Sequence, residues 1–456
     1  MSTVVCVDFG STFTKAVLVD LEHGRVIATA GHRTTIETDV LDGYDACLAQ
    51  LVEQDPRATT ARVLACSSAG GGLRIAVVGN EALVTAEAGR RVALSSGGKV
   101  VGVHAIADGD ELTDLPRSEP DVVLLTGGTD GGNVEALLEG ARLLVAAGWE
   151  GPVVVAGNVE AQAEAAAILP GPVVHAENVV PRIGVLAPDS ARAAIREMFL
   201  AHVIGGKHLS SRADFTAMVR GATPDVVLTG VEMVARGLDA RHPGAGDVVV
   251  VDVGGATTDV HSVVELDPED AGLSREVVAV TPVTRTVEGD LGMRWSAMTT
   301  VEAASQSGLE VPEALERAAE RRRSDPAYVP DTAADLDDDE AIARAAVSLA
   351  LRRHAGRAKV VVSPEGRVVE RTGKDLREVD LLVGSGGVLR HGREGVAARV
   401  LAGSTGEVEG GWQLPRDPVV VVDADYVLAA VGLLATVHPE IAHALARSLV
   451  PRGTLG

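Results

Sequence analysis

The stretch "VVVVDVGGATTDVHSV", residues 248–263, decides the fold of this chain. Four valines precede Asp252, and a glycine turn with two threonines separates that acid from a second apolar run. An apolar run of this kind, bounded by turn residues, is typical of a strand that is buried on both faces. The pattern therefore predicts a buried strand, a short turn and a second strand, with an acidic side chain at the end of the first strand.

A second stretch of the same design opens the chain. In "VDFGSTFTKAV", which begins at Val7, the acid is Asp8 and the turn carries Gly10, Ser11 and Thr12. Both stretches place an aspartate at a strand end, a glycine two residues later and hydroxyl side chains at the tip. One such turn would be an ordinary hairpin, because Asp and Gly are common in turns. Two of them in the same strand context predict a pair of equivalent sites.

The residues of these turns suit phosphate and magnesium. A glycine turn lets backbone N–H groups approach phosphate oxygens without a side chain in the way, and Ser or Thr hydroxyls add further donors. A carboxylate beside such a turn is a typical position for hydrated Mg²⁺, which bridges phosphate and protein charge. The sequence therefore predicts two phosphate loops that face each other across a cleft and clamp one nucleotide.

Length and composition limit the class of protein. A chain of 456 residues exceeds the size at which one hydrophobic core usually stops growing, so two or more lobes are expected. The formal net charge of -23 disfavours binding to nucleic acid or to an anionic membrane. Cys6, Cys47 and Cys66 are too few for a disulfide framework, no signal-peptide pattern opens the chain, and no apolar run is long enough to span a membrane. These features predict a cytoplasmic location.

The remaining segments predict how the chain is organised. From Pro120 short apolar strands alternate with helices, which indicates an inserted, parallel and doubly wound unit at about residues 120–205. "DVVLTGVEMVARGL", residues 225–238, is predicted as a strand that enters a helix. Residues 300–357 are predicted to be helical and charged, and "KVVVSPEGRVV" is predicted as a hairpin with its turn at residues 364–366.

One pair of charge runs lies within this helical region. Arg321, Arg322 and Arg323 form a basic cluster, and the acidic run of residues 337–340 follows it. Charge runs usually lie on a solvated face, so both are interpreted as exposed surface.

The order of these motifs resembles that of the actin, sugar kinase and heat-shock chaperone ATPase superfamily. "VDFGSTFTK" and "VDVGGATTD" match the first and second phosphate loops, and "VVLTGVEMVARGL" resembles the first connecting helix. "VEGDLGMRW" is similar to the turn after the second loop, "LLVGSGGVLRHG" to the adenosine loop and "DADYVLAAVGLLA" to the second connecting helix. The resemblance implies an α/β, two-lobed actin-like ATPase fold with duplicated ribonuclease-H-like lobes and an inserted α/β doubly wound unit.

The same resemblance implies domain limits. The first lobe would be residues 1–245 and the second residues 246–456. The second lobe would contain a helical and hairpin insertion at about 296–375, and a C-terminal helix at about 424–436 would pack back on the first lobe.

Within the superfamily, five strings together most resemble the glutamate mutase accessory proteins, the GlmL or MutL family, which is unrelated to mismatch repair. They are "LLTGGTDGGN", "VVVAGN", "RTVEGDLGMR", "GKDL" and "VGSGGVL". The resemblance implies an ATP-binding and ATP-hydrolysing chaperone that reactivates a coenzyme B₁₂-dependent mutase, either glutamate mutase or a related aminomutase or acyl-CoA mutase. It implies ATP or ADP and Mg²⁺ as cofactors, the mutase subunits as partners, and a possible homo-oligomer.

Carried over to this chain, the resemblance gives Asp8 and Asp252 the positioning of metal and water, and Glu232 a part in orienting the attacking water. It assigns nucleotide contacts to Gly10, Ser11, Thr12, Lys15, Gly254, Gly255, Thr257, Thr258, Gly292, Gly384, Ser385, Gly386 and Gly387. Lys15 has a surface lysine as its alternative. Asp259 either stiffens the second loop or acts directly, and Asp290 is interpreted as a turn residue.

Two further questions remain open at this level. "TGGTDGGN", residues 126–133, either binds an anion at a helix start or lets a strand and a helix pack closely, and Asn158 in the next loop is equally ambiguous. Direct cobalamin ligation is disfavoured because no Asp-x-His-x-x-Gly string is present. The alternative functions are a small-molecule kinase, for which Asp130 is the one candidate base, and a nucleotide-dependent scaffold of the actin or FtsA type.

Overall fold

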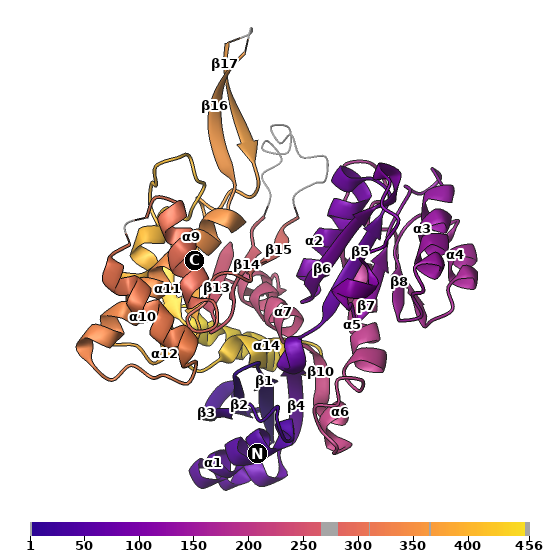
Figure 1. Cartoon of the computed structure of the whole chain (residues 1–456). Helices are drawn as coiled ribbons and strands as arrows, with labels where there is room; N and C mark the ends of the chain where they lie inside the picture. Colours follow the sequence, from indigo (N-terminus) through magenta and orange to yellow (C-terminus); the bar gives the residue numbers. More distant parts are fainter. Residues whose placement is uncertain (1, 266–280, 310, 364–365, 452–456) are drawn as a thin grey trace. The chain divides into compact units, whose positions relative to one another are not determined.

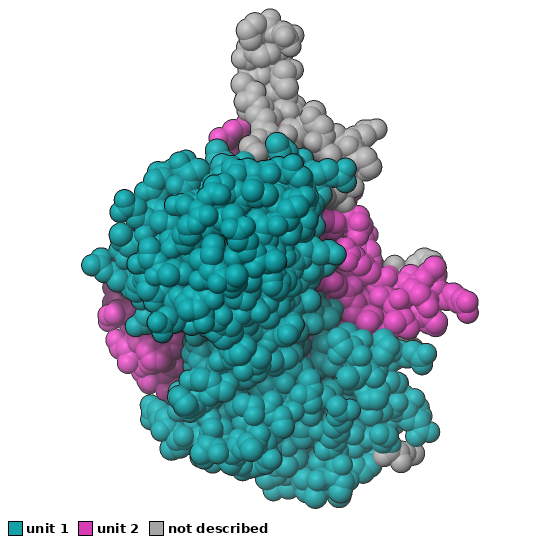
Figure 2. Space-filling view, turned by 90° about the vertical axis from the view of Figure 1, so that its right-hand side faces the viewer, with its two compact units in different colours: residues 1–230, 277–281, 432–441 teal, residues 231–276, 282–431, 442–456 magenta. Residues whose placement is uncertain are grey.

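A computed structural model of the chain describes residues 2–265, 281–309, 311–363 and 366–451. The chain divides into two units, which Figure 2 distinguishes by colour. Unit 1 comprises residues 1–230, 277–281 and 432–441, and unit 2 comprises residues 231–276, 282–431 and 442–456. Each unit has a mixed five-stranded sheet, and unit 1 also has a parallel one.

The mixed sheet of unit 1 has the strand order β10-β4-β1-β2-β3. Its strands are β1 (Thr3–Phe9), β2 (Phe13–Asp20), β3 (Arg25–Arg33), β4 (Arg62–Ser67) and β10 (Val219–Ala222). β1, β2 and β3 form an antiparallel meander, whereas β4 runs parallel to β1 and β10 parallel to β4. Helix α1 (Val40–Gln54) packs against β2 and β3. The strand, turn and second strand that the first residues predict are confirmed, and β3 completes a meander.

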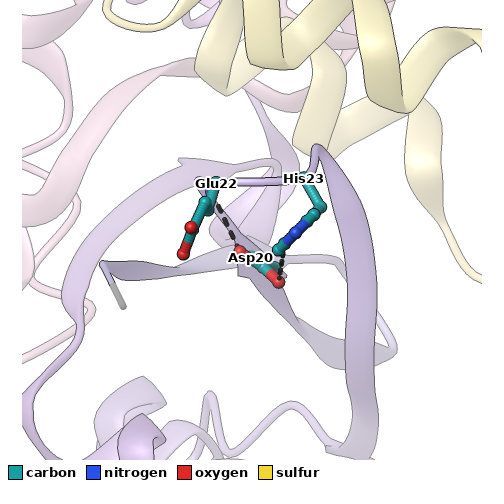
Figure 3. Close-up of side chains that lie close together, drawn as sticks. All are labelled: Asp20, Glu22 and His23. Carbon is teal, nitrogen blue, oxygen red and sulfur yellow. Dashed lines mark hydrogen bonds and ion pairs between the residues drawn. The ribbon is translucent and has the colours of Figure 1, made fainter.

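The turn between β2 and β3 is held by the buried side chain of Asp20 (Figure 3). Its Oδ1 accepts a hydrogen bond from the amide of Glu22 at 2.9 Å, and its Oδ2 lies 2.9 Å from Nδ1 of His23. These two contacts, that with the Glu22 amide first, lower the pKa of Asp20 to about 2. The turn itself uses both oxygens, which accounts for the clustering of these three side chains.

The mixed sheet of unit 2 repeats the topology of the one in unit 1. Its order is β15-β14-β13-β18-β19, with β13 (Val248–Val253), β14 (Thr258–Val263), β15 (Val283–Glu288), β18 (Leu381–Ser385) and β19 (Val419–Val422). The first three strands form an antiparallel meander, and β18 and β19 continue the sheet in parallel with β13. Read in chain order, both sheets are arranged third, second, first, fourth and fifth. The predicted duplication is confirmed by this shared order.

The helical region that the sequence predicts after the meander of unit 2 is confirmed, and its described residues form α9 (Ala297–Gln306), α10 (Glu313–Ser324) and α11 (Ala333–His354). α11 packs against β13 and β14 and contacts both α9 and α10. The hairpin of β16 (Arg357–Ser363) and β17 (Gly366–Thr372) is also confirmed, and residues 364–365 of its predicted turn lie outside the described part of the chain.

The prediction that the charge runs of these helices are solvated is wrong for part of each run. Arg322 is fully buried and donates to the carboxylate of Asp339, which is only 5% exposed. Glu340 is also buried and accepts hydrogen bonds from Arg393 and Arg399. Helical spacing is the reason, because a run of consecutive charges on a helix turns some of its members toward the core.

The parallel sheet of unit 1 has the order β6-β5-β7-β8-β9. Its strands are β5 (Arg74–Gly79), β6 (Lys99–Ala105), β7 (Val122–Leu125), β8 (Val153–Val155) and β9 (Val173–His175), so it begins before residue 120. Figure 1 shows α3 (Glu135–Ala146) and α4 (Gln162–Ile168) on one side of the sheet and α2 (Glu87–Ser95) on the other; α5 (Asp189–Met198) contacts α2. The predicted doubly wound insertion is confirmed, but its predicted start at about residue 120 is wrong, because β5 and β6 belong to the same sheet.

The segment of residues 225–238 was predicted to begin as a strand, and this is wrong. Helix α7 (Thr223–Arg236) is helical from its first residue, and the strand before it, β10, ends at Ala222. The valines and leucine of this segment have strand propensity, but Pro224 and Asp225 are residues that favour a helix start.

Helix α14 (Val427–Ala435) crosses α7 with the two backbones in contact. A Cβ atom on Gly432 would lie 1.9 Å from the carbonyl oxygen of Val226, so only glycine fits this crossing. Within the described ranges, no helix combines the length and the apolar composition that crossing a membrane requires.

Two buried histidines lie in the core of unit 2. Nε2 of His354 lies 2.8 Å from Oγ of Ser262, and Nδ1 of His354 lies 3.0 Å from Oγ1 of Thr286. Burial lowers the pKa of His261 to about 3 and lowers that of His354 well below its usual range. Both side chains are therefore neutral in the folded chain at neutral pH.

These histidines predict a loss of stability in weak acid. The unfolded chain takes up the two protons near pH 6.5, whereas the folded chain takes them up only at much lower pH. The stabilisation is therefore complete above that pH and falls as the pH drops, by about 2 kcal/mol for each histidine near pH 5. Urea unfolding at neutral and acidic pH measures it. In His261→Leu, unfolding in weak acid should take up about one proton fewer than in the parent, so the unfolding free energy should change less with pH. An unchanged slope of the unfolding free energy against pH would contradict the assignment.

Candidate functional site

The first candidate site lies at the carboxyl end of β1. Asp8 stands directly opposite Lys15 on β2, and Nζ of Lys15 lies 3.7 Å from Oδ2 of Asp8. The amide of Gly10 donates to the carbonyl of Phe13 at 3.2 Å, which closes the turn. A Cβ on Gly10 would lie 2.6 Å from that carbonyl oxygen, so the turn requires glycine. Ser11 is exposed at its tip.

The second candidate site repeats this geometry at the end of β13. Asp252 stands opposite Asp259 on β14, and the amide of Gly254 donates to the carbonyl of Thr257 at 2.9 Å. A Cβ on Gly254 would lie 2.8 Å from that carbonyl oxygen. The two turns therefore share the same strand pairing and the same closing backbone hydrogen bond at equivalent positions. They differ in one charge, since the position of Lys15 in the first turn is occupied by Asp259 in the second.

Asp259 makes contacts that stiffen its loop. Its Oδ1 accepts from Nη2 of Arg285 at 2.6 Å, and its Oδ2 accepts from Oγ1 of Thr257 at 3.1 Å. Of the two roles considered for Asp259, these contacts favour the structural one. Lys15, by contrast, is half-buried beside the carboxylate of Asp8.

The turn of residues 287–295 supports the glycine turn of the second candidate site, called the second loop below. The amides of Met293 and Arg294 donate to the carbonyls of Gly254 and Gly255 at 3.0 and 2.8 Å. A Cβ on Gly292 would lie 2.8 Å from the carbonyl oxygen of Gly255, so a larger residue would displace the loop. Asp290 accepts hydrogen bonds from Arg353 at 2.6 and 2.8 Å, in agreement with its interpretation as a turn residue.

The glycine segment of residues 384–387 lies at the same sheet edge as the second loop. Ser385 ends β18 directly beside Asp252 in the parallel register. Gly386 has φ of 104°, and a Cβ there would lie 2.2 Å from the carbonyl oxygen of Val253. Gly387 begins α12 (Gly387–Arg390). Unit 2 thus brings Asp252, the second loop and this glycine segment together.

Two residues that the sequence did not suggest touch Asp8. Oγ1 of Thr223, the first residue of α7, donates to Oδ1 of Asp8 at 2.6 Å. Sγ of Cys66 lies 3.7 Å from the same oxygen, and burial raises the pKa of this thiol well above its usual range, so it stays protonated as a donor. Cys66 lies near the carboxyl end of β4, which is next to β1, and Thr223 directly follows β10, which pairs with β4 on its other side. Only knowledge of the strand order could have placed them there.

Asp423 is a third residue that sequence reasoning missed. It follows β19, is 2% exposed, and accepts from the amides of Val427 and Leu428 at 2.7 and 3.2 Å at the start of α14. Burial, helped by the negative charge of Asp252, raises the pKa of Asp423 to about 6. A signal was present, because "VVVVDAD" at residues 419–425 repeats the "VVVVD" that leads to Asp252.

Glu232 lies on α7 within unit 2, and one of its carboxylate oxygens is 3.9 Å from Nη1 of Arg236. Nε of Arg236 is also 3.5 Å from the carboxylate of Glu265. The placement of Glu232 on a helix agrees with the sequence prediction for this segment. Its part in orienting water stays a prediction.

The glycine loop after β7 uses its polar groups internally. The amide of Gly131 donates to the carboxylate of Glu160 at 3.1 Å, and Oδ1 of Asn133 accepts from the amides of Glu135 and Ala136 at 3.1 and 3.3 Å. Nδ2 of Asn158 donates to the carbonyl of Thr129 at 2.6 Å. Of the two interpretations, these contacts favour close packing over anion binding.

Asp130 in the same loop is also engaged. Its Oδ1 accepts from Nδ2 of Asn178 at 2.8 Å and from the amide of Val159 at 3.3 Å. A carboxylate that holds two neighbouring loops is a poor candidate for a kinase base, which weakens the kinase alternative.

Comparison with known proteins finds a family model and a relative that match nearly the whole chain. The family model described as "MutL protein" matches residues 4–450. Protein MutL of Clostridium tetanomorphum is 36% identical over 452 residues, which cover 96% of this chain and 97% of that protein.

Two solved structures show a more distant likeness. Acetone carboxylase in its nucleotide-free form is 14% identical with a TM-score of 0.41, and the match covers 95% of this chain and 70% of that one. The activator of 2-hydroxyisocaproyl-CoA dehydratase from Clostridium difficile, with bound ADPNP, is 10% identical with a TM-score of 0.32, covering 96% and 95%.

Proposed function

This chain belongs to the MutL protein family, and from that premise we propose that it is an ATP-binding, ATP-hydrolysing chaperone that reactivates a coenzyme B₁₂-dependent mutase. One observation carries the nucleotide part of this proposal. Asp8 and Asp252 occupy the same position in two sheets of the same strand order, each followed by a turn that only glycine can close. The mutase part rests on the motifs that resemble the glutamate mutase accessory proteins.

The described residues suit a magnesium nucleotide. Carboxylate oxygens are the ligands that Mg²⁺ prefers, and both aspartates end their strands beside a glycine turn. Oγ1 of Thr258 in the second loop and Oγ of Ser67 at the end of β4 are buried with no hydrogen-bond partner among the described residues. Orphaned hydroxyls of this kind are costly unless a ligand or water satisfies them.

In this proposal both loops hold the same nucleotide. Asp8 and Asp252 hold Mg²⁺ and its water, and Glu232 orients the attacking water. The phosphates are bound by Gly10, Ser11, Thr12, Lys15, Gly254, Gly255, Thr257 and Thr258, with Gly292 behind the second loop and residues 384–387 against the adenosine. Bound Mg²⁺ would neutralise the charge of the transferred phosphoryl group, and the chain contributes positioning and charge stabilisation.

The coupling to the mutase would be conformational. Binding and hydrolysis of ATP would favour different conformations of the chain, and a mutase bound to one of them would be loosened so that damaged cofactor leaves. No covalent step on the protein is needed for this cycle.

Reactivation of a mutase tests the proposal. A purified, inactivated glutamate mutase or related aminomutase is incubated with this chain, Mg²⁺, ATP and fresh cofactor, and its turnover is followed. We expect recovery with ATP and none with a non-hydrolysable analogue. Failure to restore turnover, with ATP hydrolysis intact, would contradict the mutase part of the proposal and leave the nucleotide part standing.

Thr223 provides a sharper test of how Asp8 is held. Thr223→Val removes the 2.6 Å hydrogen bond to Asp8, a bond to a charged group whose loss is expected to lower ATP hydrolysis roughly tenfold or more. Thr223→Ser keeps the hydroxyl and should retain most activity. Thr229→Val is the matched control, because Oγ1 of Thr229 donates to the carbonyl of Asp225 and accepts from Nη2 of Arg196 at 3.4 Å, and neither contact involves Asp8. Equal rates for Thr223→Val and Thr229→Val would contradict the assignment.

A further inference from the structure

The parallel sheet of unit 1 presents exposed apolar side chains at one edge. In a parallel sheet the segments that follow each strand meet at the carboxyl edge. Leu83 follows β5, Val134 follows β7, Val159 follows β8 and Ile183 follows β9, with exposed fractions of 72%, 41%, 48% and 80%. Single exposed apolar residues are ordinary, but here four neighbouring strands of the sheet are each followed by a connection that presents one at the same edge.

Hydrogen bonds tie these connections into one surface. Nδ2 of Asn178, after β9, donates to Oδ1 of Asp130, after β7, at 2.8 Å, and the amide of Asp130 donates to the carbonyl of Pro181 at 3.2 Å. The connection after β8 is joined by Asn158 and by the amide of Val159, which also donates to Asp130. The glycine loop of residues 126–133 is thus hydrogen-bonded to the connections after both β8 and β9.

The connection after β5 is attached as well. Oγ1 of Thr126, at the end of β7, donates to the carbonyl of Thr85 at 3.0 Å, two residues after Leu83. A surface whose loops are already fixed loses little conformational entropy when a partner binds. Apolar side chains held out from such a surface are typical of a preformed interface.

The charge of the edge limits what can bind there. Its exposed charged residues include five acids, Glu81, Asp130, Glu135, Glu160 and Glu177, and one base, Arg182. An anionic lipid surface and a second copy of this acidic edge would both be repelled. A protein surface in which apolar side chains are bordered by lysine and arginine complements both the apolar side chains and the negative charge of this edge.

We propose that this carboxyl edge, formed by the segments that follow β5, β7, β8 and β9, is the docking surface for the client protein, through a client patch of apolar side chains bordered by lysine and arginine. The surface stands on its own geometry, while the identity of the client as the mutase rests on the proposed function. Docking here gives the inserted unit a role separate from nucleotide binding.

Binding of the purified mutase to the full chain tests this assignment. Titration calorimetry is carried out with the parent, with the edge variant Val159→Glu/Ile183→Glu, and with the control variant Val145→Glu/Val329→Glu, whose two valines are also exposed but lie on α3 and in unit 2. The edge variant should weaken the Kd roughly tenfold or more, and the control should leave it nearly unchanged. ATP affinity and the melting temperature should match the parent in both, and raised salt should weaken parent binding.

The outcomes separate the two proposals. If the parent binds the mutase and the edge variant binds equally well, or if the control weakens binding as much, the docking surface is wrong and the proposed function stands. If the parent does not bind the mutase at all, the docking assignment and the mutase part of the proposed function both fail, and the nucleotide part stands. If sedimentation shows that the edge variant abolishes self-association of the parent, the occupant is a second copy of this chain and the client assignment is overturned.

Discussion

Asp8→Asn is expected to reduce steady-state ATP hydrolysis roughly 100-fold or more, with Asp252→Asn giving a loss of similar size. The amide that replaces each carboxylate keeps its shape and can still accept the hydrogen bond that Thr223 donates to Asp8, but it lacks the negative charge that holds Mg²⁺. Circular dichroism and thermal unfolding of both variants should resemble the parent, because neither aspartate is part of the apolar core.

Asp130→Asn is the matched control for these variants. Asp130 is an exposed carboxylate of the inserted unit whose contacts are with neighbouring loops, and its replacement should leave ATP hydrolysis unchanged. Full activity of Asp8→Asn would contradict the assignment of the first loop. Loss of activity in Asp130→Asn would instead revive the kinase alternative, in which this carboxylate serves as a base.

Arg322→Met is expected to cost about 3–5 kcal/mol in the free energy of unfolding, the largest stability change that we predict. Arg322 is fully buried, donates to the carboxylate of Asp339, and also donates to the carbonyls of Ala318 and Asp335 at 2.9 and 2.8 Å. Among the described residues, its removal leaves the buried Asp339 with the two longer hydrogen bonds from Arg294, at 3.2 and 3.5 Å. Urea unfolding followed by circular dichroism measures the change.

Arg323→Met, one residue further along α10, is the control for this substitution. Arg323 is more than half exposed, and in the part of the chain that the structure describes its guanidinium pairs with Glu320 on the same helix. Its replacement should leave the unfolding midpoint unchanged within error, since exposed pairs contribute little. Equal destabilisation by the two variants would mean that Arg322 is not buried as described.

The fold was predictable from the sequence where two strings could be compared. The turns at Asp8 and Asp252 share an aspartate, a glycine and hydroxyls at the same spacing, and this pair predicted the duplicated sheets. The string that ends at Asp423 carries the same four valines and acid, but it leads into a helix instead of a glycine turn and so lacks the rest of the pattern.

Other features could not be read from local pattern. The strand propensity of residues 226–228 outweighed the helix-start signals before them, although tertiary packing made them helical. The run of three arginines was interpreted by composition, whereas burial depends on which face of α10 each one occupies. The hydrogen bond from Thr223 to Asp8 joins residues 215 positions apart, and no spacing rule reaches that far.

The central claim is that the turn after Asp8 and the turn after Asp252 bind the same magnesium nucleotide. Titration calorimetry with Mg²⁺ and a non-hydrolysable ATP analogue measures this most directly, on the parent, Asp8→Asn and Asp252→Asn. The account predicts one nucleotide per chain and a Kd weakened roughly tenfold or more by either substitution alone, although the two lie in different units. Two nucleotides per chain, or unchanged affinity in either variant, would contradict it.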